Sequence, residues 1–160
     1  EEVGCPGVAW GWRRDGRALG AALALGAEGI NRGKRFIATQ EAPGHENVKA
    51  AIVAATELDT RLVMRPLRNT ERVLRNAAVD RLLAKERSLG AAIKFEDVID
   101  EVAGVYPKIM KDGTMDVGAW SCGMVAGLIH DVPTVQELVQ RIMAEAEAII
   151  GQRLARFASA

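Results

Sequence analysis

Several features that would narrow the function are scarce or missing in this chain of 160 residues. Its two cysteines, Cys5 and Cys122, lie far apart and fit no metal-binding spacing, so we expect free thiols in a reducing cytosol. Acidic and basic residues balance at 21 each, which gives no net field toward nucleic acid or an anionic membrane. No apolar run reaches the ~18 residues of a membrane span, and no signal-peptide pattern opens the chain. These absences favour a cytoplasmic globular protein.

The beginning of the sequence also lacks a methionine. The chain starts Glu-Glu-Val, and a strand-like apolar segment follows within a few residues. We therefore expect a piece of a longer protein. The remaining composition, 49% apolar and 26% charged, is that of one ordinary domain with a hydrophobic core.

The first part of the chain has the pattern of a strand, a helix and a second strand. Residues 3–10 are short and apolar, which predicts a buried strand. Asp15 is placed to cap an alanine-rich helix over residues 17–27, where Gly26 is a natural helix end. A very short strand is expected at Gly29–Asn31. This order is typical of a parallel sheet with crossover helices.

The helical signal dominates after these strands. Residues 60–67 are the exception, because they form an extended apolar stretch that Pro66 interrupts. An Asn-Thr pair at the start of residues 69–86 predicts a capped amphipathic helix there. With strands near the front and helices elsewhere, an α/β fold would have most of its strands outside this chain. Helices are expected over residues 45–55, 69–86, 94–104 and 121–129, and from a cap at Thr134 onward.

Two glycine-containing segments follow the expected strands, "WGWRRDG" at residues 10–16 and "NRGKRF" at residues 31–36. Where a strand turns into a helix, the first helical amides are unpaired and the helix dipole adds positive potential. Glycine lets the backbone approach a phosphate closely. In (β/α)₈ barrels the loops after the last two strands commonly bind phosphate in this way. The pattern alone indicates a candidate phosphate site and no particular enzyme.

These segments and several later ones resemble the C-terminal half of nitronate monooxygenases, formerly called 2-nitropropane dioxygenases. The resemblance runs from Val3 across nearly the whole chain, and the matching segments occur in order. They read "DGRALGAALALGAEGIN-x-G-x-RFIATQEAP", "DTRLVMRPLRNTERVLRN", "FEDVIDEVAGVYPKIMKDG" and "GAWSCGMVAGLIHDVPT". The family consists of FMN-dependent TIM-barrel enzymes related to flavin-containing enoyl-acyl-carrier reductases. The resemblance therefore implies an α/β fold, the C-terminal part of a (β/α)₈ barrel with a predominantly helical remainder.

The resemblance also implies which residues bind the cofactor. The family's segment after the seventh strand reads Ala-Ser-Gly-Gly, and here Trp12 stands at the second glycine. Its segment after the eighth strand reads Gly-Ile-Asn-Met-Gly-Thr-Arg-Phe, and here Lys34 stands at the threonine. The small-residue stretch near the C-terminus approaches the flavin in this family. The implied FMN-binding positions are Gly11, Trp12, Gly33, Lys34 and Gly123.

The departures from the family pattern leave three interpretations open. Arg32 and Lys34, together with Arg13 and Arg14, could attract the phosphate as charges in place of backbone amides. The phosphate site could instead be lost, with aromatic and basic residues covering surface exposed by a missing barrel half. A third interpretation is that residues 5–34 were redesigned or poorly determined as sequence, because the departures concentrate there.

Other candidate residues carry weaker signals. His45, before a helix, is expected as a loop or capping residue, and His130 near a helix end is expected to be structural. Neither has a partner at metal-ligand spacing, so we expect no metal site. Ser121 and Cys122 lack the surroundings of a catalytic nucleophile. The family's catalytic histidine lies upstream of this chain, so no catalytic residue is assigned.

The expected function follows from the resemblance. It is an FMN-dependent oxidoreductase that oxidises alkyl nitronates with O2, of which this chain is the C-terminal portion. Residues 1–44 are expected to be the last two βα units of the barrel, and residues 45–160 the helical remainder of the same domain. The missing barrel half or a second copy would be its partner. The alternatives are a non-catalytic, self-associating helical scaffold and a flavin-dependent enoyl-thioester or quinone reductase.

Overall fold

The computed structural model describes residues 7–10 and 15–158 of the chain. The chain divides into two compact units. The first joins residues 1–41 to residues 132–160, and the second is residues 42–131.

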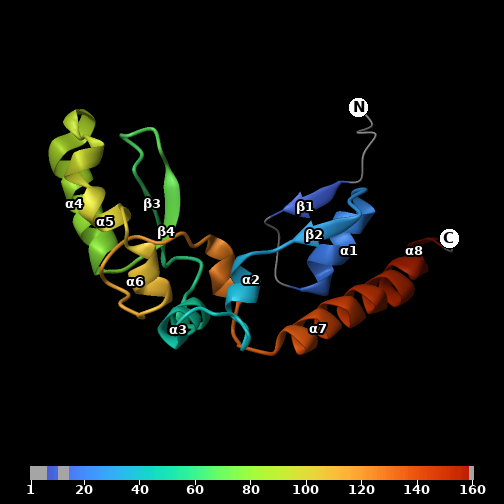
Figure 1. Ribbon diagram of the computed structural model, residues 1–160. Coiled ribbons are helices and arrows are strands. Elements are labelled where there is room, and N and C mark those ends of the chain that lie inside the picture. Colours follow the sequence, from blue (N-terminus) through green and yellow to red (C-terminus); the bar gives the residue numbers. More distant parts are fainter. Residues whose placement is uncertain (1–6, 11–14, 159–160) are drawn as a thin grey trace. The chain divides into compact units, whose positions relative to one another are not determined.

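The first unit is built on a strand–helix–strand motif. Strand β1 (Val8–Trp10), helix α1 (Gly16–Ala24) and strand β2 (Gly29–Asn31) follow one another, and the two strands pair in parallel (Figure 1). Asp15 caps α1 by accepting from the Ala18 amide at 3.3 Å. Gly26, at a φ of +90°, ends the helix as predicted, because glycine adopts this conformation without strain. The parallel α/β order is thus confirmed.

The predicted burial of the first strand is wrong in the part that the structure describes. The Val8 side chain of β1 is 61% exposed. β1 pairs with β2 alone among the described residues, in a sheet of two strands. The Val8 side chain of this strand therefore lies at the surface of the described structure rather than in a core.

The remaining helices of the first unit are the short α2 (Lys34–Ile37) and a long C-terminal run. That run is α7 (Val135–Ala148), the π-helical segment η4 (Ile149–Leu154) and α8 (Ala155–Ala158). Thr134 begins it with a capping box, since its hydroxyl accepts from the Glu137 amide and the Glu137 carboxylate accepts from the Thr134 amide. The predicted cap is confirmed.

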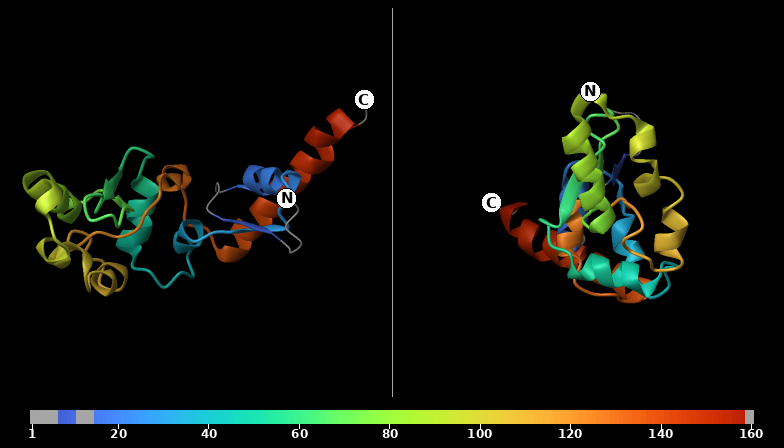
Figure 2. Two further views of the ribbon diagram at one scale, coloured as in Figure 1. Left: turned by 90° about the horizontal axis from the view of Figure 1, so that it is seen from above. Right: turned by 90° about the vertical axis from the view of Figure 1, so that its left-hand side faces the viewer.

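The core of the first unit lies where α1 packs on α7. Figures 1 and 2 both show the blue helix α1 against the orange-red C-terminal run. Gly16 allows this close approach, because a Cβ there would lie 2.4 Å from the Ala146 nitrogen of α7. The cluster of buried residues at this crossing is Leu19, Leu138, Ile142 and Ala146, with Ile30 and Phe36 packed against it.

The second unit contains a β-hairpin that the sequence patterns did not predict. Strands β3 (Thr60–Val63) and β4 (Glu71–Leu74) pair antiparallel, with Val63 opposite Glu71. The connection contains Met64 and Arg68 at positive φ, a conformation that reverses the chain. Strands are therefore not confined to the front of the chain, which corrects that expectation.

The helix predicted over residues 69–86 begins later, as α4 (Ala77–Leu89). Its cap is Asn76, whose side-chain oxygen accepts from the Val79 amide at 2.9 Å. The Asn76 side-chain nitrogen donates to the carbonyls of Met115 and Gly118, at 2.7 and 2.9 Å. Residues 71–74 pair with β3 instead, because buried strand pairing outweighs the helical spacing of their apolar side chains.

Two further predicted helices are shorter than expected. Residues 94–104 contain a 3₁₀ turn, η2 (Phe95–Asp97), and the short helix α5 (Ile99–Val102), which meet at Val98. In residues 121–129 the helical part is only a 3₁₀ segment, because Ser121 forms a bridge with Val73 and keeps the chain extended. The helices of this unit besides α4 are α3 (Glu46–Ala54), η1 (Gly90–Ala92), η2 (Phe95–Asp97), α5 (Ile99–Val102), α6 (Tyr106–Met110) and η3 (Met124–Leu128).

The core of the second unit lies between the hairpin and α4. One set of buried apolar side chains packs together there, which fixes the hairpin against the helices. Its members are Val63, Met64, Val73, Val79, Leu82, Ile93, Val98 and Ala119.

Candidate functional site

The carboxyl ends of β1 and β2 lie side by side. The parallel register places Trp10 opposite Asn31, so the segments that follow both strands leave the same edge of the pair. This is the edge at which parallel α/β sheets bind ligands. Gly11 and Trp12, two predicted FMN-binding residues, lie outside the described residues. The sequence predicts that the two glycine segments lie close together. The register of the two strands supports this, because both strands end at the same edge.

Carboxylates occupy the first turn of α1, the helix that follows β1. The Asp15 side chain accepts from the Ala18 amide. The Glu145 carboxylate, from α7, accepts from the Gly16 amide at 2.7 Å. The N-terminus of a helix attracts anions, and here two side-chain carboxylates already accept hydrogen bonds from its first amides. Any phosphate at this corner would need other donors.

Arg32 supplies such donors. Its Nη2 donates to the Asp15 carbonyl at 3.1 Å, which ties the segment after β2 to the start of α1. Its Nε and Nη1 are buried without a hydrogen-bond partner among the residues that the structure describes. Burial lowers the pKa of the Arg32 guanidinium, and the Asp15 carboxylate partly offsets that effect. The two nitrogens are orphaned donors at the edge where the phosphate is expected.

Gly33 and Lys34 lie directly beside Arg32. Gly33 is the residue before α2, and Lys34 is the first residue of α2. Apart from its chain neighbours, no heavy atom lies within 4 Å of the position that a Gly33 Cβ would take. The backbone at Gly33 is therefore open, whereas two of the Arg32 nitrogens beside it are buried.

Gly123 belongs to the second unit, where it precedes η3 in an extended conformation. A polar cluster adjoins it in sequence. The Ser121 hydroxyl donates to the Glu71 carboxylate. Burial and the Glu71 charge raise the pKa of the nearby Tyr106 phenol, and Ser121 offsets part of that rise. Sequence reasoning missed this cluster, because its members come from three separate segments and match no motif.

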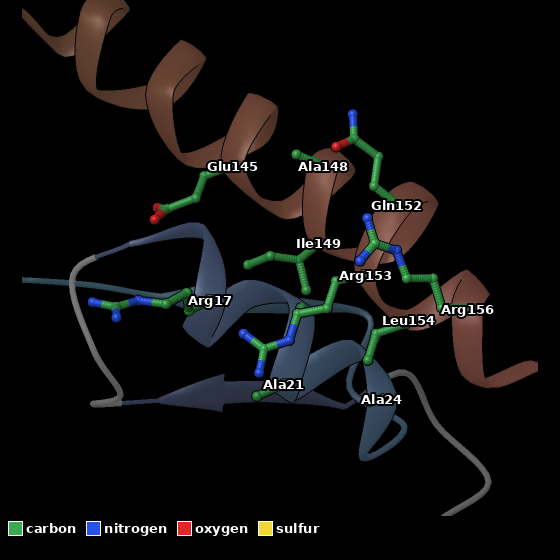
Figure 3. Close-up of a pocket in the computed structure, with 11 residues that line it drawn as sticks. Arg17, Ala21, Ala24, Glu145, Ala148, Ile149, Gln152, Arg153, Leu154 and Arg156 are labelled. Carbon is green, nitrogen blue, oxygen red and sulfur yellow. The ribbon is translucent and has the colours of Figure 1, made fainter.

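A groove in the first unit was also not predicted. Figure 3 shows it between α1 and the C-terminal run, with Arg17, Arg153 and Arg156 among the residues around it. Apolar side chains such as Ile149 and Leu154 complete its lining, and its volume is about 790 Å³.

Within residues 7–10 and 15–158 no group of side chains has the composition of a metal site. No helix there is long and apolar enough to cross a bilayer.

Comparison with known proteins identifies the family. The family model of nitronate monooxygenase matches residues 1–145, and the chain belongs to this family. Among solved structures, FabK from Thermotoga maritima superposes with a TM-score of 0.85 at 28% identity, over 96% of this chain and 48% of that one. Nitroalkane oxidase from Streptomyces ansochromogenes has a TM-score of 0.65 at 25% identity, over 96% of this chain and 42% of that one.

Two kinds of curated protein are among the relatives of this chain. The (3aS,4S,5R,7aS)-5-hydroxy-7a-methyl-1-oxo-octahydro-1H-indene-4-carboxyl-CoA dehydrogenase of Rhodococcus jostii is 29% identical over 91% of this chain and 51% of its own length. A probable nitronate monooxygenase of Staphylococcus haemolyticus is 38% identical over 38% of this chain and 17% of its own length. The chain thus spans about half the length of the first of these relatives. The family prediction is confirmed. The described strands form two separate pairs rather than a complete barrel.

Proposed function

We propose that this chain is the C-terminal part of an FMN-dependent oxidoreductase that oxidises alkyl nitronates with O2. The family membership and the flavin chemistry implied by the resemblance support this proposal. The observation that carries it is the shared edge of β1 and β2, where Arg32 has two buried nitrogens without a described partner. Such an edge, with a cation beside it, fits the anionic end of a flavin nucleotide.

The residues present fit the FMN phosphate in a particular way. Arg32 would hold it as a charged donor, and Gly33 and Lys34 would approach it from the segment after β2. The first turn of α1 contributes little, since Asp15 and Glu145 already accept from its amides. FMN, when bound, would supply the electron transfer. This arrangement favours the electrostatic interpretation of the departures from the family pattern.

We also propose how the two parts of this chain correspond to a (β/α)₈ barrel. Residues 1–44 would provide the last two βα units and residues 45–160 the rest of the same domain, from which α7 returns to pack on α1. Gly11, Trp12 and Gly123 remain proposed cofactor contacts. No residue of this chain is assigned as the catalytic base, so we expect the purified 160-residue chain to be inactive toward nitronates.

FMN titration of the purified chain tests this proposal. Binding is expected to change the visible flavin absorption and quench the flavin fluorescence. Replacing Arg32 with glutamine should weaken binding about tenfold, the lower range for a hydrogen bond to a charged group. Arg153→Gln is the matched control, because it removes an arginine of the separate groove and should leave binding unchanged. A chain that stays colourless, or equal losses in the two variants, would refute the proposed phosphate site.

A second candidate activity is a flavin-dependent enoyl-thioester or quinone reductase. It is favoured by the higher structural similarity to FabK, with a TM-score of 0.85, than to nitroalkane oxidase, with 0.65. Anaerobic mixing of the complete FMN-bound enzyme, of which this chain is the proposed C-terminal part, separates the two activities. Bleaching of bound FMN by a nicotinamide favours the reductase, and bleaching by an alkyl nitronate favours the oxidase.

The non-catalytic alternative is a self-associating scaffold. Its support is the two-stranded β1–β2 sheet with an exposed Val8, since unpaired strand edges attract another chain. Sedimentation of the FMN-free protein tests it. A dimer that binds no FMN would favour the scaffold over the enzyme.

A further inference from the structure

The groove between α1 and the C-terminal run has a base of small residues. Gly20 and Ala21 of α1 line it together with Ala148 and Ile149 of the run (Figure 3). A Cβ on Gly20 would lie 3.7 Å from the Ile149 Cγ2, so the two helices are in contact at this base. All of the lining belongs to the first unit. The groove volume of about 790 Å³ is that of a site for a small molecule, about 300–1,000 Å³.

The π-helical segment η4 forms one wall of the groove. Hydrogen bonds in a π-helix span five residues, so Ile149 and Leu154 lie on the same side of the run, and both line the groove. In an α-helix two residues five apart would point about 140° away from each other. The π-helical segment therefore places the Leu154 side chain in the groove, beside Arg153. Segments of this kind are rare and recur at functional sites.

Charges are balanced at one end of the groove. The Asp15 carboxylate accepts from the Arg17 Nε and Nη2 at 2.8 and 2.6 Å. Glu145, at the same end, accepts from the Gly16 amide. It supplies the one carboxylate among the described residues that line the groove. An anion entering at this end would meet groups whose charges are already compensated.

The other end of the groove is cationic. Arg153 and Arg156 lie three residues apart, so they are neighbours on the helix surface and their charges repel each other. Figure 3 shows the Arg153 side chain extending from the run toward α1, and the Arg156 side chain extending back along the run. An oxyanion between the two guanidinium groups would accept hydrogen bonds from both and relieve their repulsion. The side-chain amide of Gln152, which also lines the groove, adds a neutral donor.

The remaining lining is aliphatic. Leu154 is 41% exposed in the groove, so a ligand there would cover apolar surface. No aromatic side chain is among the described residues of the lining, so nothing there stacks on a flat ring. Arg17 and Ala24 mark the two ends of the groove on α1, about 10 Å apart along the helix axis. This length and this lining favour an alkyl chain.

We propose that this groove binds a single-chain amphipathic anion. Its oxyanion head, a carboxylate or a phosphate, is held by Arg153 and Arg156, and its alkyl chain lies over Ala21 and Ile149. Fatty acids and alkyl phosphates share this chemistry. The site does not depend on FMN, because the described residues proposed to hold the FMN phosphate do not line the groove; they are Arg32, Gly33 and Lys34.

The first test uses calorimetric titration of the unmodified chain. Octanoate should bind with a stoichiometry of one per chain. Hexanoate should bind about tenfold more weakly, because two fewer methylene groups are buried. Octan-1-ol, which has no charge, should also bind about tenfold more weakly. Equal affinity for octanoate and octan-1-ol, or for octanoate and hexanoate, would overturn the proposal. Octyl phosphate should also bind, and the tighter of the two octyl anions identifies the head group.

The second test uses arginine variants to locate the head group. Arg153→Gln and Arg156→Gln should each weaken octanoate binding about tenfold, as expected for a lost hydrogen bond to a charged group. Arg17→Gln should have a smaller effect, because Asp15 already holds that guanidinium. Arg87→Gln is the matched control, since it removes the same charge from an exposed position of α4 in the second unit. Equal losses in all four variants would show general charge attraction and overturn the site.

The third test changes the α1 wall of the groove. Ala21 lies on the exposed side of α1, and glutamate and glutamine are both good helix formers, so either variant should fold. Ala21→Glu places a carboxylate across the groove from Arg153 and should weaken octanoate binding about tenfold. Ala21→Gln has the same size without the charge and should weaken it less. An equal loss in the two variants would overturn the placement of the head group.

A lipid bilayer is the competing source of the same chemistry. Sedimentation with phosphatidylglycerol vesicles tests it, and nitrogen-15 NMR of the chain with monomeric octanoate gives the position of the ligand. Saturable shifts of the Ala21 and Gln152 amide resonances would support the groove. Vesicle binding without such shifts would assign the C-terminal run to a lipid surface and overturn the proposal. FMN takes no part in these measurements, so their failure leaves the proposed function untouched.

Discussion

The crossing of α1 and α7 allows a quantitative test of the packing. Gly16 is the first residue of α1 and faces the backbone of α7. A Cβ at this position would lie 2.4 Å from the Ala146 nitrogen, 2.5 Å from the Ile142 carbonyl oxygen and 2.6 Å from the Glu145 Cβ. The first two of these are backbone atoms of a helix, which cannot move aside independently. Gly16→Ala must therefore push the two helices apart.

The expected cost combines two effects. Overpacking of a well-packed contact costs about 1–3 kcal/mol. Separation of the helices also lengthens the 2.7 Å bond from the Gly16 amide to the Glu145 carboxylate, which adds about 1 kcal/mol. Alanine in place of glycine returns less than ~1 kcal/mol at the start of a helix. We expect Gly16→Ala to lower the free energy of unfolding by about 2–3 kcal/mol.

Urea denaturation followed by far-ultraviolet circular dichroism measures this difference. Gly20→Ala is the matched control in the same helix, because its Cβ would lie 3.7 Å from the Ile149 Cγ2, an ordinary contact. That variant should be stabilised by up to ~1 kcal/mol. A Gly16→Ala protein within ~0.5 kcal/mol of the unmodified chain, the usual range of a surface substitution, would refute the close crossing.

Three further predictions concern the second unit. Gly113→Ala should destabilise it by more than Gly104→Ala as measured by thermal unfolding, because both glycines have positive φ (+69° and +67°) but a Cβ on Gly113 would lie 2.3 Å from the His45 ring. Asn76→Ala should cost about 2–3 kcal/mol in urea denaturation, since it removes the α4 cap and two donated hydrogen bonds. The pKa of Asp59 is lowered by hydrogen bonds from the amide and hydroxyl of a nearby threonine. Its contribution to stability is present above the ordinary pKa and is lost as pH falls, so Asp59→Asn should flatten the acid side of a stability–pH profile.

The elements predicted correctly are those whose signals are local. Asp15 and Thr134 cap α1 and α7, and Gly26 ends α1, each through contacts within a few residues. His45 was expected as a loop or capping residue, and its Nδ1 accepts from the Asn47 amide at 3.1 Å. Such signals act within a single turn, so the sequence alone specifies them.

The start of the helix predicted over residues 69–86 was wrong because it depends on a distant partner. Residues 71–74 have apolar spacing that suits a helix, yet Val73 is buried in a hairpin and also forms a bridge with Ser121. No pattern within the segment indicates those partners. The helix consequently starts after its cap Asn76, whose carbonyl partners lie about forty residues further along the chain.

Of the candidate sites, one was indicated by a local sequence pattern and another was not. Gly33 and Lys34 were indicated by the strand–glycine–helix pattern and the family resemblance, and the structure places Arg32 beside them with two orphaned nitrogens. Tyr106 and Glu71 carried no signal in the sequence. The Ser121 hydroxyl reaches the Glu71 carboxylate because the segment that contains Ser121 runs along β4.

The sequence by itself determined the family, the parallel strand–helix–strand order and the helix caps, because these depend on short-range backbone chemistry and on residues in a fixed order. The tertiary structure alone decided that the Glu145 carboxylate accepts from the Gly16 amide and that the Ser121 hydroxyl donates to the Glu71 carboxylate. Both contacts join segments far apart along the chain. Their geometry is set by how whole elements pack, a property that emerges only when the core closes.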